Sequence, residues 1–228
     1  MSTEHTIMPG EPVNQQIYRF LRHEIVNCII HPGSLLSEKD VSVRFNVSRQ
    51  PVREAFIKLA EAGLILVLPQ RGTFVRKISV QRVEDGRFIR EAVEVAVTRR
   101  AALEASATGL AALEHNLQLQ QLAAERHDST TFMELDDEFH RLIAKSIQCD
   151  LAWETVENIK ASMDRVRFLT LSEVSPPEHL IEQHWRIYQA LCAKDADAAE
   201  KAIRSHLQEM ITSIAPVTQQ NRDWFDME

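Results

Sequence analysis

The side chains best suited to chemistry include a pair four positions apart, Asp136 and His140. On a helix this spacing places both residues on one face, close enough to bind the same ion. His184 and His206 fall in the last two long segments of helical pattern, which a short turn joins as antiparallel neighbours. Three imidazoles and one carboxylate would form an N₃O set, which suits zinc, nickel, iron(II) or manganese and leaves coordination positions open.

Simpler interpretations exist for the same residue types. The spacing of Asp136 and His140 is also that of an ordinary ion pair, and Asp137 and Glu138 beside them are expected to be solvated. A histidine on a helix is more often a surface or hydrogen-bonded residue than a metal ligand. That interpretation applies to the histidines outside the set: His5, His23, His31, His115, His127 and His179.

A helical-bundle metalloenzyme is the main alternative from another class of function. Di-iron bundles need a Glu three residues before the metal-binding histidine. The residues at those positions before His184 and His206 are Ile181 and Ile203. One mononuclear site with no obvious general base beyond its ligands also argues against hydrolysis. We therefore expect no enzymatic activity.

A second group of candidate functional residues lies in the first third of the chain. Arg49 and Arg53 would project from one face of a short helix, opposite the apolar Val52 and Phe56. This is the layout of a recognition helix in the DNA major groove, where arginine contacts guanine or phosphate. The alternative is a solvated helix face. The predicted DNA-contacting residues are Lys39, Ser48, Arg49, Gln50, Arg53, Arg71 and Gly72.

The net charge of −7 agrees with DNA binding only when the chain is divided. Residues 1–77 hold ten Lys or Arg against seven Asp or Glu, which gives +3. The remaining residues hold 16 against 26, which gives −10. Residues 1–77 form a mildly basic part, here called the head, and residues 78–228 form an acidic part, here called the body. This difference in charge indicates two functions in one chain.

The apolar periodicity predicts a mainly all-α fold in two domains. The first of three short helices is predicted from Val13 to about Ile30, and Ser37 and Ser48 are predicted to cap the other two. With a small β-hairpin, Leu64–Leu68 with Thr73–Val75, these helices form a winged helix-turn-helix over 13–77. A flexible arm (1–12) precedes it, a linker (78–83) follows, and a polar tail (215–228) ends the chain. The domain over 84–214 is predicted to be an antiparallel six-helix bundle, with segments 80–107, 110–127, 130–147, 151–172, 177–193 and 196–214.

Composition also restricts the compartment. The three cysteines, Cys28, Cys149 and Cys192, are odd in number and have no C-x-x-C spacing, which fits a reducing environment. Charged residues interrupt the first thirty positions, so we expect no signal peptide, and no apolar run has the length of a membrane span. A cytoplasmic protein with no membrane partner is predicted.

The head resembles the GntR family of bacterial regulators. The resemblance rests on Pro32–Glu38, on VSRQPVREAFIKLAEAGLI at Val47–Ile65 and on PQRGTFV at Pro69–Val75. It implies a transcription factor, with Lys39, Arg49, Arg53 and the Arg71-Gly72 tip at the family's DNA-contacting positions. A homodimer on an inverted-repeat operator follows, most simply as a repressor.

The body resembles the FCD effector domain of the FadR-type branch of that family. The D-x-x-x-H pair and the two later histidines match the family's metal ligands, which implies one divalent metal per subunit at Asp136, His140, His184 and His206, with zinc or nickel favoured over iron or manganese. Arg90 and Glu94 match the opening of the domain. The resemblance also implies a small organic acid as effector, with Arg90 as its second anchor. Arg165 and Arg167 are predicted to be surface residues rather than pocket residues, and six body helices favour the VanR-like subgroup.

Overall fold

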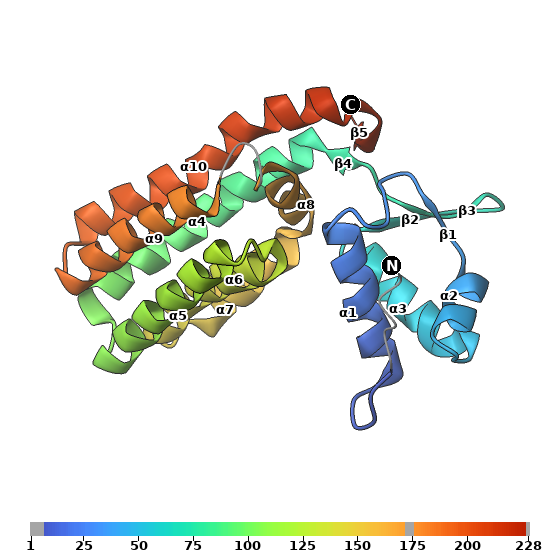
Figure 1. The fold of residues 1–228 in the computed structure, drawn as a ribbon, viewed down its shortest axis with the longest axis horizontal. Coiled ribbons are helices and arrows are strands. Elements are labelled where there is room, and N and C mark those ends of the chain that lie inside the picture. Colours follow the sequence, from blue (N-terminus) through green and yellow to red (C-terminus); the bar gives the residue numbers. More distant parts are fainter. Residues whose placement is uncertain (1–6, 172–175, 227–228) are drawn as a thin grey trace. The chain divides into compact units, whose positions relative to one another are not determined.

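The structure, a computed structural model, describes residues 7–171 and 176–226, without the side chains of residues 210–213 (Figure 1). It divides into two compact units. One comprises Met1–Arg82 together with Asn221–Glu228, and the other comprises Val83–Gln220. Half of the predicted arm, residues 1–6, lies outside the described residues, as does His5.

The first unit contains a helix-turn-helix with a wing. Its core is made by apolar residues of the first and third helices, among them Ile17, Leu21, Val52 and Leu59, all fully buried. Ser37 caps the second helix by accepting a hydrogen bond from the Asp40 amide at 3.3 Å, as its position predicts. The elements are α1 (Val13–Val26), β1 (Leu35–Leu36), α2 (Glu38–Arg44), α3 (Arg49–Glu61), β2 (Ile65–Leu68) and β3 (Gly72–Val75).

The wing is a three-stranded antiparallel sheet rather than a two-stranded hairpin. The strand order is β1-β3-β2, with Leu36 opposite Thr73 and Leu68 opposite Gly72. Two residues of β1 are too few to give an alternating pattern, which is why the sequence does not predict this strand. Gly72 has a φ of +108°, a conformation that only glycine adopts without strain.

A second small sheet follows the wing. Strand β4 (Ile78–Ser79), in the predicted linker, pairs in parallel with β5 (Phe225–Asp226) near the end of the chain. A short 3₁₀ helix, η1 (Arg222–Trp224), precedes β5. The predicted tail therefore contains a buried strand residue, because Phe225 is only 3% exposed.

The second unit is a bundle of helices that lie side by side in Figure 1. Helix α5 packs on α6 and α9, and α9 packs on α10. Their contacts enclose an apolar core that includes Leu113, Leu117, Phe139, Ile187 and Ile203. The helices are α4 (Val80–Glu104), α5 (Ala107–Glu125), α6 (Ser129–Ser146), α7 (Asp150–Ile159), α8 (Ala161–Thr170), α9 (Pro177–Cys192) and α10 (Ala196–Gln220).

The prediction of six bundle helices is wrong by one, because the segment 151–172 is two helices separated at Lys160. The side chain of Lys160 is 2% exposed and its ammonium hydrogen-bonds to Asp137 and Asp164. Apolar periodicity carries no signal of a buried lysine at a helix junction. Seven helices among the described residues also remove the argument for the VanR-like subgroup.

Two other boundaries differ from the sequence prediction. Helix α1 ends at Val26 rather than near Ile30, because Cys28 has a φ of +52° and leaves the helix. Helix α10 continues through Pro216 to Gln220 instead of ending at 214. None of the helices among the described residues combines the length and apolar character needed to cross a membrane.

Close packing of α5 on α6 generates a test of the bundle. A Cβ at Gly109 would lie 2.7 Å from the Cβ and 3.2 Å from the Cα of Ser146. Gly109→Ala should therefore destabilise the protein by about 1–3 kcal/mol in chemical denaturation. Adding Ser146→Gly should recover part of that loss. Gly86→Ala, which meets the flexible Met163 tip at 3.3 Å, is the control and should cost less. Equal effects of the two alanine variants would contradict this packing.

Candidate metal centre and DNA-reading surface

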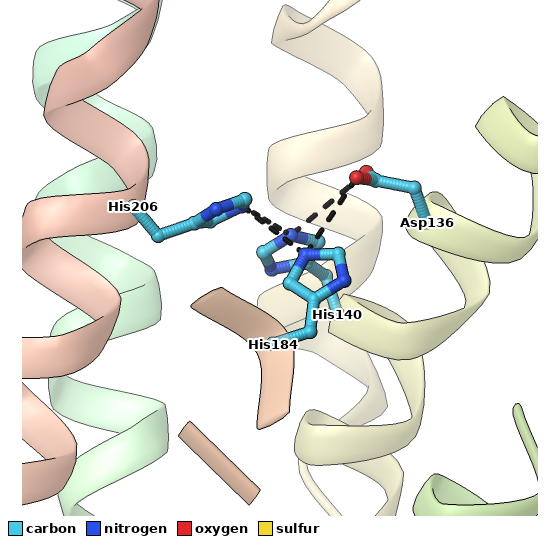
Figure 2. A group of neighbouring side chains, drawn as sticks. All are labelled: Asp136, His140, His184 and His206. Atoms are coloured by element: carbon cyan, nitrogen blue, oxygen red, sulfur yellow. Dashed lines mark hydrogen bonds and ion pairs between the residues drawn. The ribbon is translucent and has the colours of Figure 1, made fainter. Parts of the chain in front are cut away.

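Four side chains converge inside the bundle, as Figure 2 shows: Asp136 and His140 from α6, His184 from α9 and His206 from α10. All four residues are buried, and one ligand atom from each lies within 4.8 Å of the others. The sequence predicted this set, and the structure brings all of its members together.

The three imidazoles present the same atom to the centre. The Nε2 atom of His206 lies 3.2 Å from that of His140 and 3.3 Å from that of His184. The Asp136 carboxylate lies 3.6 Å from His184 Nε2 and 3.9 Å from His140 Nε2. Two nitrogens that each lie about 2.0–2.1 Å from a tetrahedral zinc are about 3.3 Å apart. The observed spacing fits such an ion.

Each imidazole has an oxygen close behind it at Nδ1, and two of these contacts are hydrogen bonds. His184 Nδ1 lies 2.9 Å from the side-chain oxygen of Gln120. His206 Nδ1 lies 2.7 Å from that of Gln183. His140 Nδ1 lies 2.6 Å from a carboxylate oxygen of Glu94, without the alignment of a hydrogen bond. Outer partners of this kind fix the orientation and tautomer of metal-binding histidines.

The amide orientation of Gln120 follows from its other partners. Its nitrogen donates to Asn116 Oδ1 at 2.7 Å, and the Asn116 amide donates to the Leu135 backbone carbonyl at 3.1 Å. Gln120 must therefore accept from His184, which places the proton on Nδ1 and a lone pair on Nε2. Gln183 donates likewise to the Glu209 carboxylate, so its oxygen accepts from His206.

The sequence reasoning missed Gln120 and Gln183, although a signal existed for one of them. Gln120 and Asn116 occupy the same helical stripe as the buried Leu113 and Leu117. A polar residue on an apolar stripe indicates a buried hydrogen bond. Gln183 directly precedes a ligand and has no comparable pattern.

Burial keeps the centre in the protonation state that a metal requires. It lowers the pKa of His184 to about 3 and that of His206 well below the usual value. Burial alone would raise the pKa of Asp136, but the charges of Arg167 and the neighbouring histidines together outweigh it, so that this pKa falls. The neutral imidazoles of His184 and His206 and the ionised carboxylate of Asp136 are ready to bind a cation at neutral pH.

A buried ion network lies against the centre. Arg167 donates to Asp136 and Asp137, the latter at 2.8 Å, while Lys160 donates to Asp137 and Asp164. The sequence expectations fail here: Arg165 is fully buried, the Arg167 side chain is 14% exposed, and Asp137 is paired rather than solvated. Surface assignments failed because the oppositely charged partners come from another helix.

A pocket opens beside the metal ligands. The volume of this pocket is about 50 Å³, several times the space that one water molecule needs. Its lining combines charged and polar side chains with apolar ones. Arg90 belongs to this lining, with its Nε 2.5 Å from Glu94, while its buried Nη2 has no hydrogen-bond partner among the described residues. The lining residues are Arg90, Phe132, Met133, Asp136, Arg167, Thr170, Leu171, Leu180, His206, Leu207 and Glu209.

In the first unit, the predicted DNA-contacting residues form an exposed polar surface. Arg49, Gln50 and Arg53 are exposed in the first two turns of α3, opposite the buried Val52 and Phe56. Lys39 is exposed near the start of α2, and Arg71-Gly72 lies at the tip of the wing.

Two details of this surface differ from expectation. Ser48 occupies the N-cap position of α3, but its side chain makes no capping hydrogen bond. Arg53 forms an ion pair with Glu38 at 3.2 Å. Since both side chains are partly exposed, this pair stabilises the fold little and can be exchanged for a phosphate or base contact.

The outer partners of the metal ligands generate a first test. Replacing Gln120 by Leu removes the acceptor that fixes His184, so metal affinity should fall about 10–100-fold. The neighbouring exposed Gln121→Leu is the control and should leave affinity unchanged. Competition titration of zinc against a chelator measures both. Unchanged affinity of Gln120→Leu would show that His184 does not depend on this contact.

Burial of neutral histidine generates a pH prediction. The pKa of His184 is about 3 in the folded state and about 6.5 in an unfolded chain. Below pH 6.5 the unfolded chain therefore binds a proton that the folded protein does not. The metal-free protein should lose up to about 1.4 kcal/mol of stability per pH unit from this group as pH falls. Urea denaturation at pH 7 and 5.5 measures the loss. Equal stability at both values would contradict the buried neutral state, and the exposed His115→Gln should leave the slope unchanged.

Comparison with known proteins agrees with both units. Residues 13–75 match the gntR family of bacterial regulatory proteins, and residues 87–209 match the FCD domain. The chain is 54% identical over 228 residues to the HTH-type transcriptional repressor RspR of Escherichia coli (strain K12), with 100% of both chains covered. It is 32% identical to an HTH-type transcriptional regulator in an unstable DNA locus of Streptomyces ambofaciens, covering 95% of this chain and 91% of that one.

Solved structures show the same fold. E. coli McbR/YncC superposes with a TM-score of 0.76 at 23% identity, covering 91% of this chain and 98% of that one. The two family matches and the full-length similarity to RspR together assign the chain to a family. The chain belongs to the GntR family, in its branch with an FCD domain, and is a DNA-binding transcriptional regulator rather than an enzyme.

Proposed function

We propose that this protein is a homodimeric repressor whose operator binding is controlled by a small carboxylic acid bound beside a divalent metal. The observation that carries the proposal is the convergence of three Nε2 atoms and Asp136 beside a pocket that Asp136 and His206 help to line. The relative of 54% identity is described as a repressor, which supports the sign of regulation.

The donor set favours zinc or nickel in this centre. Imidazole nitrogens suit both ions, and three of them with one carboxylate oxygen complete four positions. Iron(II) and manganese accept the same donors, with manganese favouring oxygen. An ion that takes a fifth or sixth ligand would accept it from the pocket, which Asp136 and His206 help to line.

The pocket chemistry favours an acid as that ligand. A buried carboxylate needs a cation and hydrogen-bond donors to offset its lost hydration. The ion would supply the cation, and the Nη2 of Arg90, which has no hydrogen-bond partner in the described part of the chain, would supply a donor. The apolar lining, which includes Phe132, Leu180 and Leu207, suits the carbon skeleton of a small acid.

Two heads in a symmetric dimer would read two half-sites of an inverted repeat. An acid that binds more tightly to a state in which the two heads do not match the two half-sites would release the protein from the operator. Its effect cannot exceed the difference between its affinities for the two states.

The direct experiment identifies what the purified protein carries. Metal analysis and mass spectrometry should find about one zinc or nickel per subunit and a small carboxylic acid. Operator binding is then measured with metal alone, acid alone and both. We expect release only with both. Release by metal alone would make the protein a metal sensor, and no change with any combination would make the metal structural.

The recognition helix has its own test. Arg53→Ala should abolish the difference in affinity between operator and random DNA, because it removes a base-reading or clamping side chain. Lys58→Ala, the same charge change near the end of α3, is the control and should keep this selectivity. Salt-dependent gel shifts measure both. Normal operator selectivity of Arg53→Ala would contradict the assigned face.

A further inference from the structure

The sheet formed by β4 and β5 joins two distant parts of the chain. Ile78 pairs with Phe225 and Ser79 pairs with Asp226, in parallel. Helix α4 begins at Val80, directly after β4. Helix α10 ends at Gln220, and η1 then leads into β5. The first unit is therefore connected to the bundle through the start of α4 and also through the end of α10.

The C-terminal segment Asn221–Asp226 is anchored in the first unit by two apolar contacts. Phe225 is 3% exposed and its strand partner Ile78 is fully buried. The Trp224 ring stacks on His31, with centroids 4.8 Å apart and planes 24° apart. Stacking of Trp224 and burial of Phe225 hold a short segment firmly.

Both anchors lie at the base of the wing. Ile78 is three residues beyond Val75, the last residue of β3. His31 begins the loop that ends in β1, and in this loop Gly33 donates to the Val75 carbonyl at 2.8 Å while Val75 donates to Ser34 at 2.8 Å. The segment thus contacts the two chain stretches that set the position of β3 and of the Arg71-Gly72 tip.

The same two helices carry part of the candidate ligand site. Arg90 and Glu94 lie on α4, and His206 and Glu209 lie on α10. From His206 to Gln220, α10 is an unbroken helix with a length of about 21 Å at 1.5 Å per residue. A shift of α10 against α4 at the site would therefore pull β5 against β4.

We propose that the segment Asn221–Asp226 is a strap through which the state of the ligand site on α10 controls the base of the wing. The inference rests on the proposed function in placing a metal at this site, whose binding changes the base of the wing without by itself releasing the operator. A strap with two ends makes the wing respond to the relative position of α4 and α10 rather than to either helix alone.

The first measurement needs no ligand. Trp224→Ala/Phe225→Ala in the full chain should speed amide hydrogen exchange at residues 72–79 about tenfold or more in the metal-free protein, because β4 loses its partner. Arg222→Ala/Asp223→Ala changes two exposed residues of the same segment and should leave this exchange unchanged. Unchanged exchange in the aromatic variant would overturn the proposal, whatever the metal does.

The second measurement adds zinc to the stripped proteins. In the parent chain and the exposed-residue control, zinc should change exchange at residues 72–79 severalfold. In the aromatic variant the change should be lost while zinc still binds with the same stoichiometry. Trp224→Phe, which keeps the stacking, should retain the response. An equal change of exchange with zinc in the aromatic variant would overturn the strap. A parent chain that binds no zinc would refute the metal centre, and the exchange of the metal-free proteins would then still decide the strap.

Discussion

Three imidazoles that present Nε2 to one point form an arrangement that a cation would complete. The Nε2 atoms of His184 and His206 carry lone pairs, because each of these rings donates its proton to an acceptor at Nδ1, while His140 Nδ1 lies 2.6 Å from Glu94. The oxygens at Nδ1 lie on α4, α5 and α9, while the ligands lie on α6, α9 and α10. One ion at this point would therefore connect five helices of the bundle.

The ion network extends this dependence to the remaining helices. Arg167 on α8 contacts the ligand Asp136 and also Asp137, which Lys160 binds at the junction of α7 and α8. Breaking one partner of such a buried network leaves a charge uncompensated, which costs far more than the intact network contributes. Because the pocket borders this network and the ligands together, any anion that enters meets a site whose charges are already arranged.

Much of the architecture could be predicted from sequence, because it depends on short-range patterns. The helix-turn-helix follows from capping and apolar spacing, as at Ser37, and the pair Asp136 and His140 follows from helical periodicity. The convergence of His184 and His206 was predictable because a short turn makes their helices neighbours. Features that depend on contacts far apart in sequence were missed. The helix break at buried Lys160 and the pairing of Phe225 with Ile78 belong to this class.

X-ray absorption spectroscopy of the bound metal tests the central claim most directly. A centre made by His140, His184, His206 and Asp136 predicts only nitrogen and oxygen neighbours, at about 2.0–2.2 Å for zinc, together with the outer-shell scattering of imidazole rings. A sulfur neighbour at about 2.3 Å, or a shell without imidazole, would contradict this account of the site.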